Sequence, residues 1–157
     1  MIGIVIANNP FNQDSRLYMH LQRTLKKEII CTSIGLHTGR KVNMKIKPAP
    51  VDTGVLFIRT DLPDARPIPA DFKMVCDTTL ATSLGYDGVS VSTVEHILSA
   101  FSGMGVDNAL IELDSFEVPI MDGSARPFVE MLKGVGTRSQ GKLKKMLVIK
   151  KPVTVKN

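Results

Sequence analysis

The feature that most constrains the fold is a change in hydrophobic period near the middle of the chain. Over residues 41–48 ("KVNMKIKP"), Val42, Met44 and Ile46 alternate with polar residues, a pattern typical of a half-buried strand. After residue 93 the apolar residues are spaced as on one face of a helix, at Val94, Ile97, Leu98 and Phe101. Because both periods occur, the sequence predicts a mixed α+β chain.

Further segments extend this prediction. A second helix is expected over residues 126–136, a strand pair over residues 78–92, and single strands over residues 25–34, 55–60, 108–114 and 145–155. Three prolines exclude a helix between residues 62 and 71. The predicted architecture is a two-layer sandwich, in which a mixed β-sheet has the helices on one face.

The charge of the chain favours anionic partners. The formal net charge is +5, and residues 142–156 contain six lysines and no acidic residue. A solvated strand face is the favoured interpretation of this segment, and a nucleic-acid patch is the alternative. Only two Tyr and six Phe are available for stacking on bases, which disfavours binding of single-stranded RNA.

The length, the ends and the cysteines bear on domains and localisation. At 157 residues the chain is long enough for one compact domain. Residues 1–22 are rich in turn formers, so an irregular extension is expected before a domain over residues 23–143.

The apolar stretch at residues 2–7 is too short for a membrane span or a signal core. The two cysteines form no Cys-x-x-Cys pattern, so reduced thiols and a cytoplasmic protein that does not span a membrane are expected.

The segment "STVEH", residues 92–96, has two interpretations. Ser92 followed three residues later by Glu95 is the pattern of a capping box, in which each side chain bonds the amide of the other residue. Alternatively, His96 binds Zn²⁺ through a ring nitrogen, and Glu95 takes a proton from a metal-bound water, whose pKa zinc lowers to about 7. The pattern alone favours the capping box and leaves the zinc site open.

Three longer segments, in this order and at these spacings, resemble one known family. They are "TLKKEIICTSIGLHTGRKVNMKIKPAPVDTGVLFIRTDL" from Thr24, "STVEHILSAFSGMGVDNALIEL" from Ser92 and "VPIMDGSARPFV" from Val118. Together they resemble the first of the two similar domains of UDP-3-O-acyl-N-acetylglucosamine deacetylase, a zinc amidase of bacterial lipid A synthesis. The resemblance extends from Gln22 to the C-terminus.

The resemblance implies roles for particular residues. Glu95 is implied to be the general base, and His96 is implied to be a zinc ligand. The Gly-Leu-His-Thr-Gly loop of the family and the segment after residue 78 border its active site. The loop supplies Leu36 and His37 as candidates for substrate contact, and the segment after residue 78 supplies Leu80 and Ala81 as weaker candidates. The Asp-Gly pair in "IMDGSA" is interpreted as a turn.

The implied reaction is hydrolysis of the acetamide on the glucosamine of a UDP-linked, acylated sugar, with Zn²⁺ as cofactor. Such a zinc site usually has three protein ligands. In the family a second domain supplies the other two, a His and an Asp, and residues 144–157 are expected to be its start. The chain has three histidines and no His-x-x-x-Asp pattern, so we expect it to carry the base and one ligand. The alternative is an inactive fragment, or a basic α+β module that binds anionic ligands or nucleic acid.

Overall fold

The computed structural model describes residues 21–64, 66–145, 151–152 and 154, and its largest element is a five-stranded sheet. In the order of the sheet, its strands are β2 (Ile29–Ile34), β3 (Lys41–Pro48), β9 (Ala109–Leu113), β4 (Val55–Arg59) and β5 (Ile68–Pro69). Neighbouring strands are antiparallel, except that β4 and β9 are parallel. The sheet is therefore mixed, as predicted.

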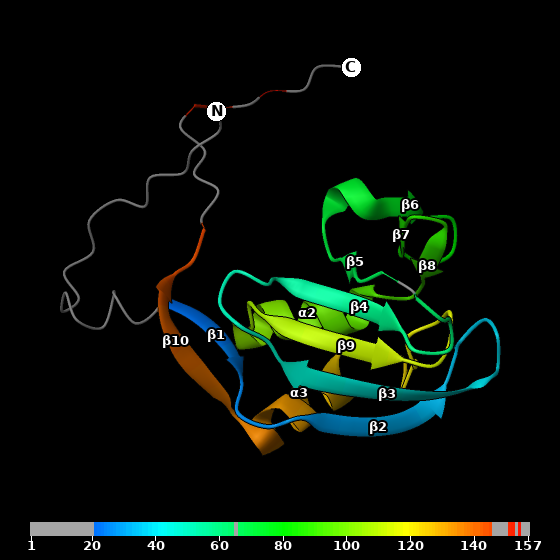
Figure 1. The fold of residues 1–157 in the computed structure, drawn as a ribbon, viewed down its shortest axis with the longest axis horizontal. Coiled ribbons are helices and arrows are strands. Elements are labelled where there is room, and N and C mark those ends of the chain that lie inside the picture. The colour runs from blue at the N-terminus through cyan, green and yellow to red at the C-terminus, as the bar shows by residue number, and fades with distance from the viewer. Residues whose placement is uncertain (1–20, 65, 146–150, 153, 155–157) are drawn as a thin grey trace.

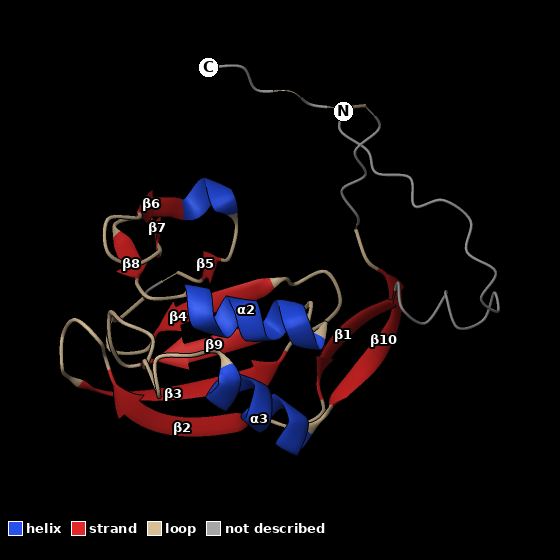
Figure 2. Cartoon of the chain, turned by 180° about the vertical axis from the view of Figure 1, so that it is seen from behind, coloured by secondary structure: helices blue, strands red, loops and turns tan. Residues whose placement is uncertain are grey.

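Two helices cover one face of this sheet. α2 (Glu95–Met104) and α3 (Arg126–Val135) lie behind the sheet in Figure 1 and in front of it in the reverse view of Figure 2. The predicted α+β two-layer sandwich is therefore confirmed. α2 ends at Gly105, whose left-handed backbone (φ 67°) closes the last turn. In the part of the chain that the structure describes, no helix is long and apolar enough to cross a membrane.

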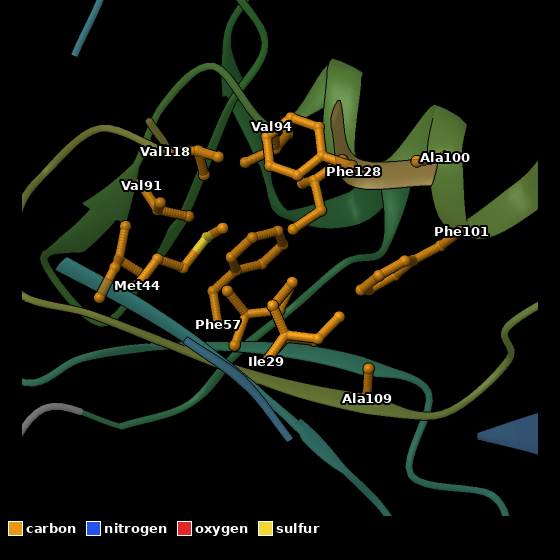
Figure 3. Close-up of a cluster of buried hydrophobic side chains, with 14 of the residues drawn as sticks. Ile29, Met44, Phe57, Val91, Val94, Ala100, Phe101, Ala109, Val118 and Phe128 are labelled. Atoms are coloured by element: carbon orange, nitrogen blue, oxygen red, sulfur yellow. The ribbon is translucent and has the colours of Figure 1, made fainter. Parts of the chain in front are cut away.

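The hydrophobic core lies between the sheet and the helices. The alternation in β3 places its apolar residues on the inner face of the sheet, where they are buried: Val42, Met44 and Ile46. Figure 3 shows Phe57 of β4 in the same cluster as Phe101 of α2 and Phe128 of α3. This packing fixes α2 against the sheet and thereby positions the residues at the N-terminus of the helix.

A small three-stranded sheet precedes α2 in the chain. Its strands are β6 (Val75–Asp77), β7 (Ser83–Tyr86) and β8 (Val89–Val91), and the 3₁₀ helix η1 (Phe72–Met74) directly precedes β6. β7 and β8 confirm the predicted strand pair. Asp87 and Gly88 between them both have positive φ (52° and 79°), the geometry of a type I′ hairpin turn. Only residues 92–94 separate β8 from α2, so this sheet lies at the beginning of the helix.

A two-stranded sheet joins the ends of the described domain. β1 (Leu21–Leu25) pairs antiparallel with β10 (Thr137–Leu143). The strand expected over residues 25–34 is confirmed as β2, but its predicted start is wrong, because Leu25 belongs to β1 and the chain turns before β2 begins at Ile29. β10 was not predicted.

The start of the domain also differs from the expectation. β1 begins at Leu21 and buries Gln22, because pairing with β10 extends order into the last two residues of the segment expected to be irregular. Residues 1–20 and most of the strand expected over residues 145–155 lie outside the described residues. Cys31 and Cys76 are both free thiols.

Candidate functional site

The residues before α2 do not form the predicted capping box, and no side chain caps the N-terminus of this helix. The Ser92 amide donates to the carbonyl of Phe116 (2.8 Å), and the Ser83 hydroxyl donates to that of Ser92 (2.9 Å). Glu95 Oε2 accepts a hydrogen bond from the amide of Thr82 (3.1 Å). The capping box is wrong because tertiary contacts engage both side chains. The Glu95 carboxylate is therefore not used to cap the helix.

Thr93 has a left-handed backbone, with a φ of 61°. For a β-branched residue this conformation is an outlier, which costs about 1–3 kcal/mol. Two contacts hold it: the Ser92 carbonyl accepts from the Val118 amide (3.0 Å), and the Thr93 hydroxyl donates to Glu117 (3.0 Å). The turn at Thr93 leads the chain from its pairing with residues 116–118 directly into α2. It therefore sets the place at which Glu95 begins the helix.

His96 lies in the first turn of α2, and it is partly buried. Its Nδ1 atom is buried and makes no hydrogen bond to the residues that the structure describes. A ring nitrogen in this state is suited to bind a metal ion. Within residues 21–64, 66–145, 151–152 and 154, however, no group of three or more His, Cys, Asp or Glu side chains could hold one. The residues present therefore fit one ligand of a zinc site and not a complete site.

A second carboxylate, Glu117, connects the approach to α2 with the loop over residues 35–39. It is fully buried, and its oxygens accept from the amides of His37 (3.0 Å) and Thr38 (3.1 Å) and from the hydroxyls of Thr38 and Thr93 (both 3.0 Å). Burial acts to raise the pKa of Glu117, but the hydrogen bonds outweigh it and hold the pKa below its ordinary value. Glu117 is therefore ionised at neutral pH.

The Gly-Leu-His-Thr-Gly loop is a compact turn between β2 and β3. The Gly39 amide donates to the carbonyl of Gly35 (3.0 Å), and Gly39 has the positive φ (61°) that the turn requires. Leu36 and His37 are both exposed, and Leu36 is 56% exposed. The loop therefore presents these two side chains at the surface, while Glu117 holds its backbone from the inner side.

His37 and Leu80 line one cavity, with a volume of about 350 Å³. Its wall also includes Ala81, Ser92 and Phe116. Leu80 is 81% exposed, which leaves its side chain available for contact with a ligand. The structure thus brings together three of the four predicted substrate contacts, although they come from distant parts of the chain.

Neither Glu95 nor His96 is in the lining of this cavity, and Glu95 is connected to it through Thr82. The Thr82 amide bonds Glu95, and its chain neighbours Ala81 and Ser83 both line the cavity. Leu36 is not part of this lining, so its contact with a substrate stays a prediction. The candidate site therefore consists of the first turn of α2, the cavity beside it and the loop held by Glu117.

The motifs of the sequence do not single out Glu117. Its one local signal is its place in "FEVPIM", residues 116–121, where all the other residues are apolar. An acid in such a run is typically buried and hydrogen-bonded, because its charge needs partners away from water. The identity of the partners has no local signal, since His37 is 80 residues away and Thr93 is 24 residues away.

Comparison with known proteins identifies one family. The family model for UDP-3-O-acyl N-acetylglycosamine deacetylase matches residues 22–157. The curated UDP-3-O-acyl-N-acetylglucosamine deacetylase of Syntrophus aciditrophicus is 61% identical over 137 residues, which cover 87% of this chain and 44% of that protein. The protein of the same name from Saccharophagus degradans is 56% identical over 136 residues, with 87% and 45% covered. The one from Chromohalobacter salexigens is 52% identical over 134 residues, with 85% and 44% covered.

The coverage of these relatives is unequal. The matched residues take up most of this chain but less than half of each relative. The chain therefore corresponds to part of the length of the proteins it resembles.

Proposed function

Because the chain belongs to the UDP-3-O-acyl N-acetylglycosamine deacetylase family, we propose that it takes part in deacetylating a UDP-linked, 3-O-acylated N-acetylglucosamine, a step of lipid A synthesis. The reaction hydrolyses an acetamide to an amine and acetate. It is the reaction in the names of the three relatives described above. The activity is proposed for the whole protein, since the chain spans less than half the length of these relatives.

The bond from Glu95 to Thr82, whose chain neighbours line the cavity, carries this proposal. We assign Glu95 the role of general base, which takes a proton from the attacking water. The amide of Thr82 holds one carboxylate oxygen in place at 3.1 Å. A carboxylate used in a helix cap would be engaged with the backbone of its own helix, and Glu95 is not.

We assign His96 the role of one zinc ligand, supported by the buried Nδ1 atom described above. Zinc, when bound, polarises a carbonyl group and lowers the pKa of a bound water to about 7. A tetrahedral hydrolytic site needs two further protein ligands. In this proposal, parts of the protein outside the described residues supply them.

The cavity lined by His37 and Leu80 is the proposed place of the sugar. Its volume of about 350 Å³ is within the range of small-molecule sites. The ring of His37 can donate a hydrogen bond to the substrate, and the exposed side chains of Leu36 and Leu80 offer apolar contact. The net charge of +5 favours a substrate that carries a diphosphate.

The test of the base is acetate release from UDP-3-O-acyl-N-acetylglucosamine by the whole protein with Zn²⁺ present. Glu95→Gln is expected to lower kcat by about 10²–10⁴-fold, the usual contribution of a general base. The matched control is Glu112→Gln, because Glu112 bonds Lys47 on the sheet and lines no part of the site. Equal rates for Glu95→Gln and the unchanged protein would contradict the assignment. No acetate release from the unchanged whole protein would contradict the proposed activity.

The role of His96 as a zinc ligand is tested by titrating the whole protein with Zn²⁺ alone. His96→Ala is expected to abolish binding of Zn²⁺ at the proposed site. His37→Ala is the control, because His37 lies in the loop at the cavity and is not assigned to the metal. Equal zinc affinity in the whole protein with and without His96→Ala would contradict the role of His96.

A further inference from the structure

Glu117 lies where two parts of the candidate site meet. Its chain neighbours Phe116 and Val118 both bond the backbone of Ser92, the first through its carbonyl (2.8 Å) and the second through its amide (3.0 Å). Ser92 is three residues before Glu95. The backbone on both sides of Glu117 is therefore fixed to the segment that leads into α2.

The carboxylate of Glu117 bonds both parts at once. Oε1 accepts from the His37 amide and the Thr93 hydroxyl, each at 3.0 Å. Oε2 accepts from the amide and the hydroxyl of Thr38, at 3.1 and 3.0 Å. One side chain thus joins the loop that carries His37 to the turn that begins the helix of Glu95.

This bonding pattern requires a carboxylate. Each oxygen accepts from a backbone amide, Oε1 from that of His37 and Oε2 from that of Thr38, and an amide N–H can only donate. A glutamine of the same shape would turn its NH₂ group towards one of these amides. A buried charge is unfavourable unless such bonds hold it, so its presence indicates a constraint on position and not a need for packing.

The surroundings leave the carboxylate little freedom to move. A Cβ atom at Gly35 would lie 2.4 Å from Oε2 of Glu117 and 2.4 Å from the Thr38 hydroxyl, so the loop can approach this closely only with a glycine. On the other side, Thr93 holds the strained backbone with φ of 61°. A displaced carboxylate would therefore displace both the loop and the turn.

We propose that Glu117 is a positioning residue, which fixes the loop of His37 relative to the first turn of α2. This inference deepens the proposed function and rests on it for its meaning in the reaction. The loop brings His37 to the cavity, and Thr93 is two residues before Glu95. A shift of about 1 Å between groups that hold a substrate and groups that act on it is able to lower a rate by about 10²-fold.

The first test is the Glu117→Gln variant, observed by nuclear magnetic resonance in the 157-residue chain. Amide protons bonded to a carboxylate resonate downfield, so the His37 and Thr38 signals are expected to move upfield and to lose protection from hydrogen exchange. The control is Glu112→Gln, which removes the carboxylate bonded to Lys47 and should leave both signals in place. Unchanged His37 and Thr38 amides in Glu117→Gln would overturn the proposal.

A pair of variants at Thr93 keeps the test decisive if Glu117→Gln does not fold. Thr93→Ser keeps the hydroxyl that bonds Glu117, and Thr93→Val removes it while keeping the branched shape. The His37 amide signal is expected to be preserved in the Ser variant and shifted in the Val variant. The same signal position in both variants would contradict a link through this hydroxyl.

Kinetics separate positioning from simple loss of folded protein. For deacetylation of the UDP-sugar, Thr93→Val is expected to raise KM and to lower kcat/KM by up to about 10²-fold, and Thr93→Ser should restore both. A smaller folded fraction would lower the apparent kcat and leave KM unchanged, which would overturn the proposal. If the unchanged whole protein releases no acetate, the proposed function fails, while the amide signals still decide whether Glu117 joins the loop to the turn.

Discussion

Two buried polar networks lie at opposite ends of β9, and they differ in charge. Before the strand, the Asn108 side chain donates to those of Gln22 (2.9 Å) and Gln140 (2.8 Å) and accepts from the Gly54 amide (2.8 Å). After the strand, Glu117 accepts from four donor groups and donates to none. The first network is neutral, whereas the second holds a buried charge.

The neutral network holds strands together, whereas the charged network holds parts of the candidate site. Gln22 is in β1 and Gln140 is in β10, so Asn108 ties the two-stranded sheet to the main sheet with amides that satisfy one another. At the other end, a buried charge occurs together with the strained backbone of Thr93. This less favourable arrangement occurs beside Glu95, and strain that a fold does not need is typical of functional sites.

The largest expected effect comes from crowding the charged network. Gly35→Ala would place a methyl group 2.4 Å from Oε2 of Glu117, and we expect it to lower the free energy of unfolding by about 3 kcal/mol. Gly103→Ala is the matched control, because a Cβ atom there meets nothing within 4 Å and alanine favours the helix. Urea denaturation of both variants measures the effect. A Gly35→Ala variant as stable as the unchanged protein would show that the contact at Glu117 is easily rearranged.

The next effect comes from breaking the neutral network. Asn108→Ala leaves buried partners without a bond and is expected to lower the free energy of unfolding by about 2 kcal/mol. The His37 and Thr38 amide signals should stay in place, because the Glu117 network is at the other end of β9. Urea denaturation measures the loss of stability, and the amide spectrum shows whether the His37 and Thr38 signals move. A shift of those amides in Asn108→Ala would mean that the two networks are coupled.

The two networks should differ in how much stability they lose as the pH falls. The folded pKa of Glu117 lies below its ordinary value, so its contribution to stability is complete above the unfolded pKa of about 4.3. The contribution is lost as the pH falls through the lower folded value. We therefore expect Glu117→Gln to lose less stability than the unchanged protein between pH 7 and about pH 3, and Asn108→Ala to lose as much as the unchanged protein. Parallel losses in all three proteins would contradict this assignment of acid sensitivity.

The smallest effect concerns a charge at the rim of the neutral network. Lys142 donates to Asp52, which also accepts from Gln22, and 55% of the Lys142 side chain is exposed. Lys142→Met is expected to lower the free energy of unfolding by less than about 1 kcal/mol, because exposed ion pairs contribute little. Thermal unfolding at low and high salt is a sufficient measurement. A loss as large as that of Asn108→Ala would mean that the exposed ion pair contributes as much stability as the buried amides.

Elements with a strong local pattern could be predicted from the sequence. β3 and β9 have alternating or continuous apolar residues, and α2 has a clear helical period, so their positions follow from local rules. β10 has the sequence "TRSQGKL", with one apolar residue in seven. It is a strand because it pairs with β1 at the other end of the domain, and local periodicity carries no sign of that pairing.

The same limit applies to the candidate site. For Glu95 and His96 the local pattern favoured a capping box, and the resemblance to the family assigned them the roles of base and zinc ligand, which stay predictions. The capping box was a sound local inference, but contacts from Ser83 and Thr82 replaced it. Glu117 has one local sign, an acid in an apolar run, and its role depends on partners that only the folded chain brings close.

The pairing of β1 with β10 has a consequence for the synthesis of the chain. β1 leaves the ribosome first among the described strands, but its partner follows only after β9 and α3 have been made. Gln140, which completes the contacts of Asn108, emerges with β10. Contacts between such distant residues form late, because a long loop must close before they stabilise anything. This domain is therefore expected to acquire its final order as one delayed event near the end of translation of its residues, and not strand by strand.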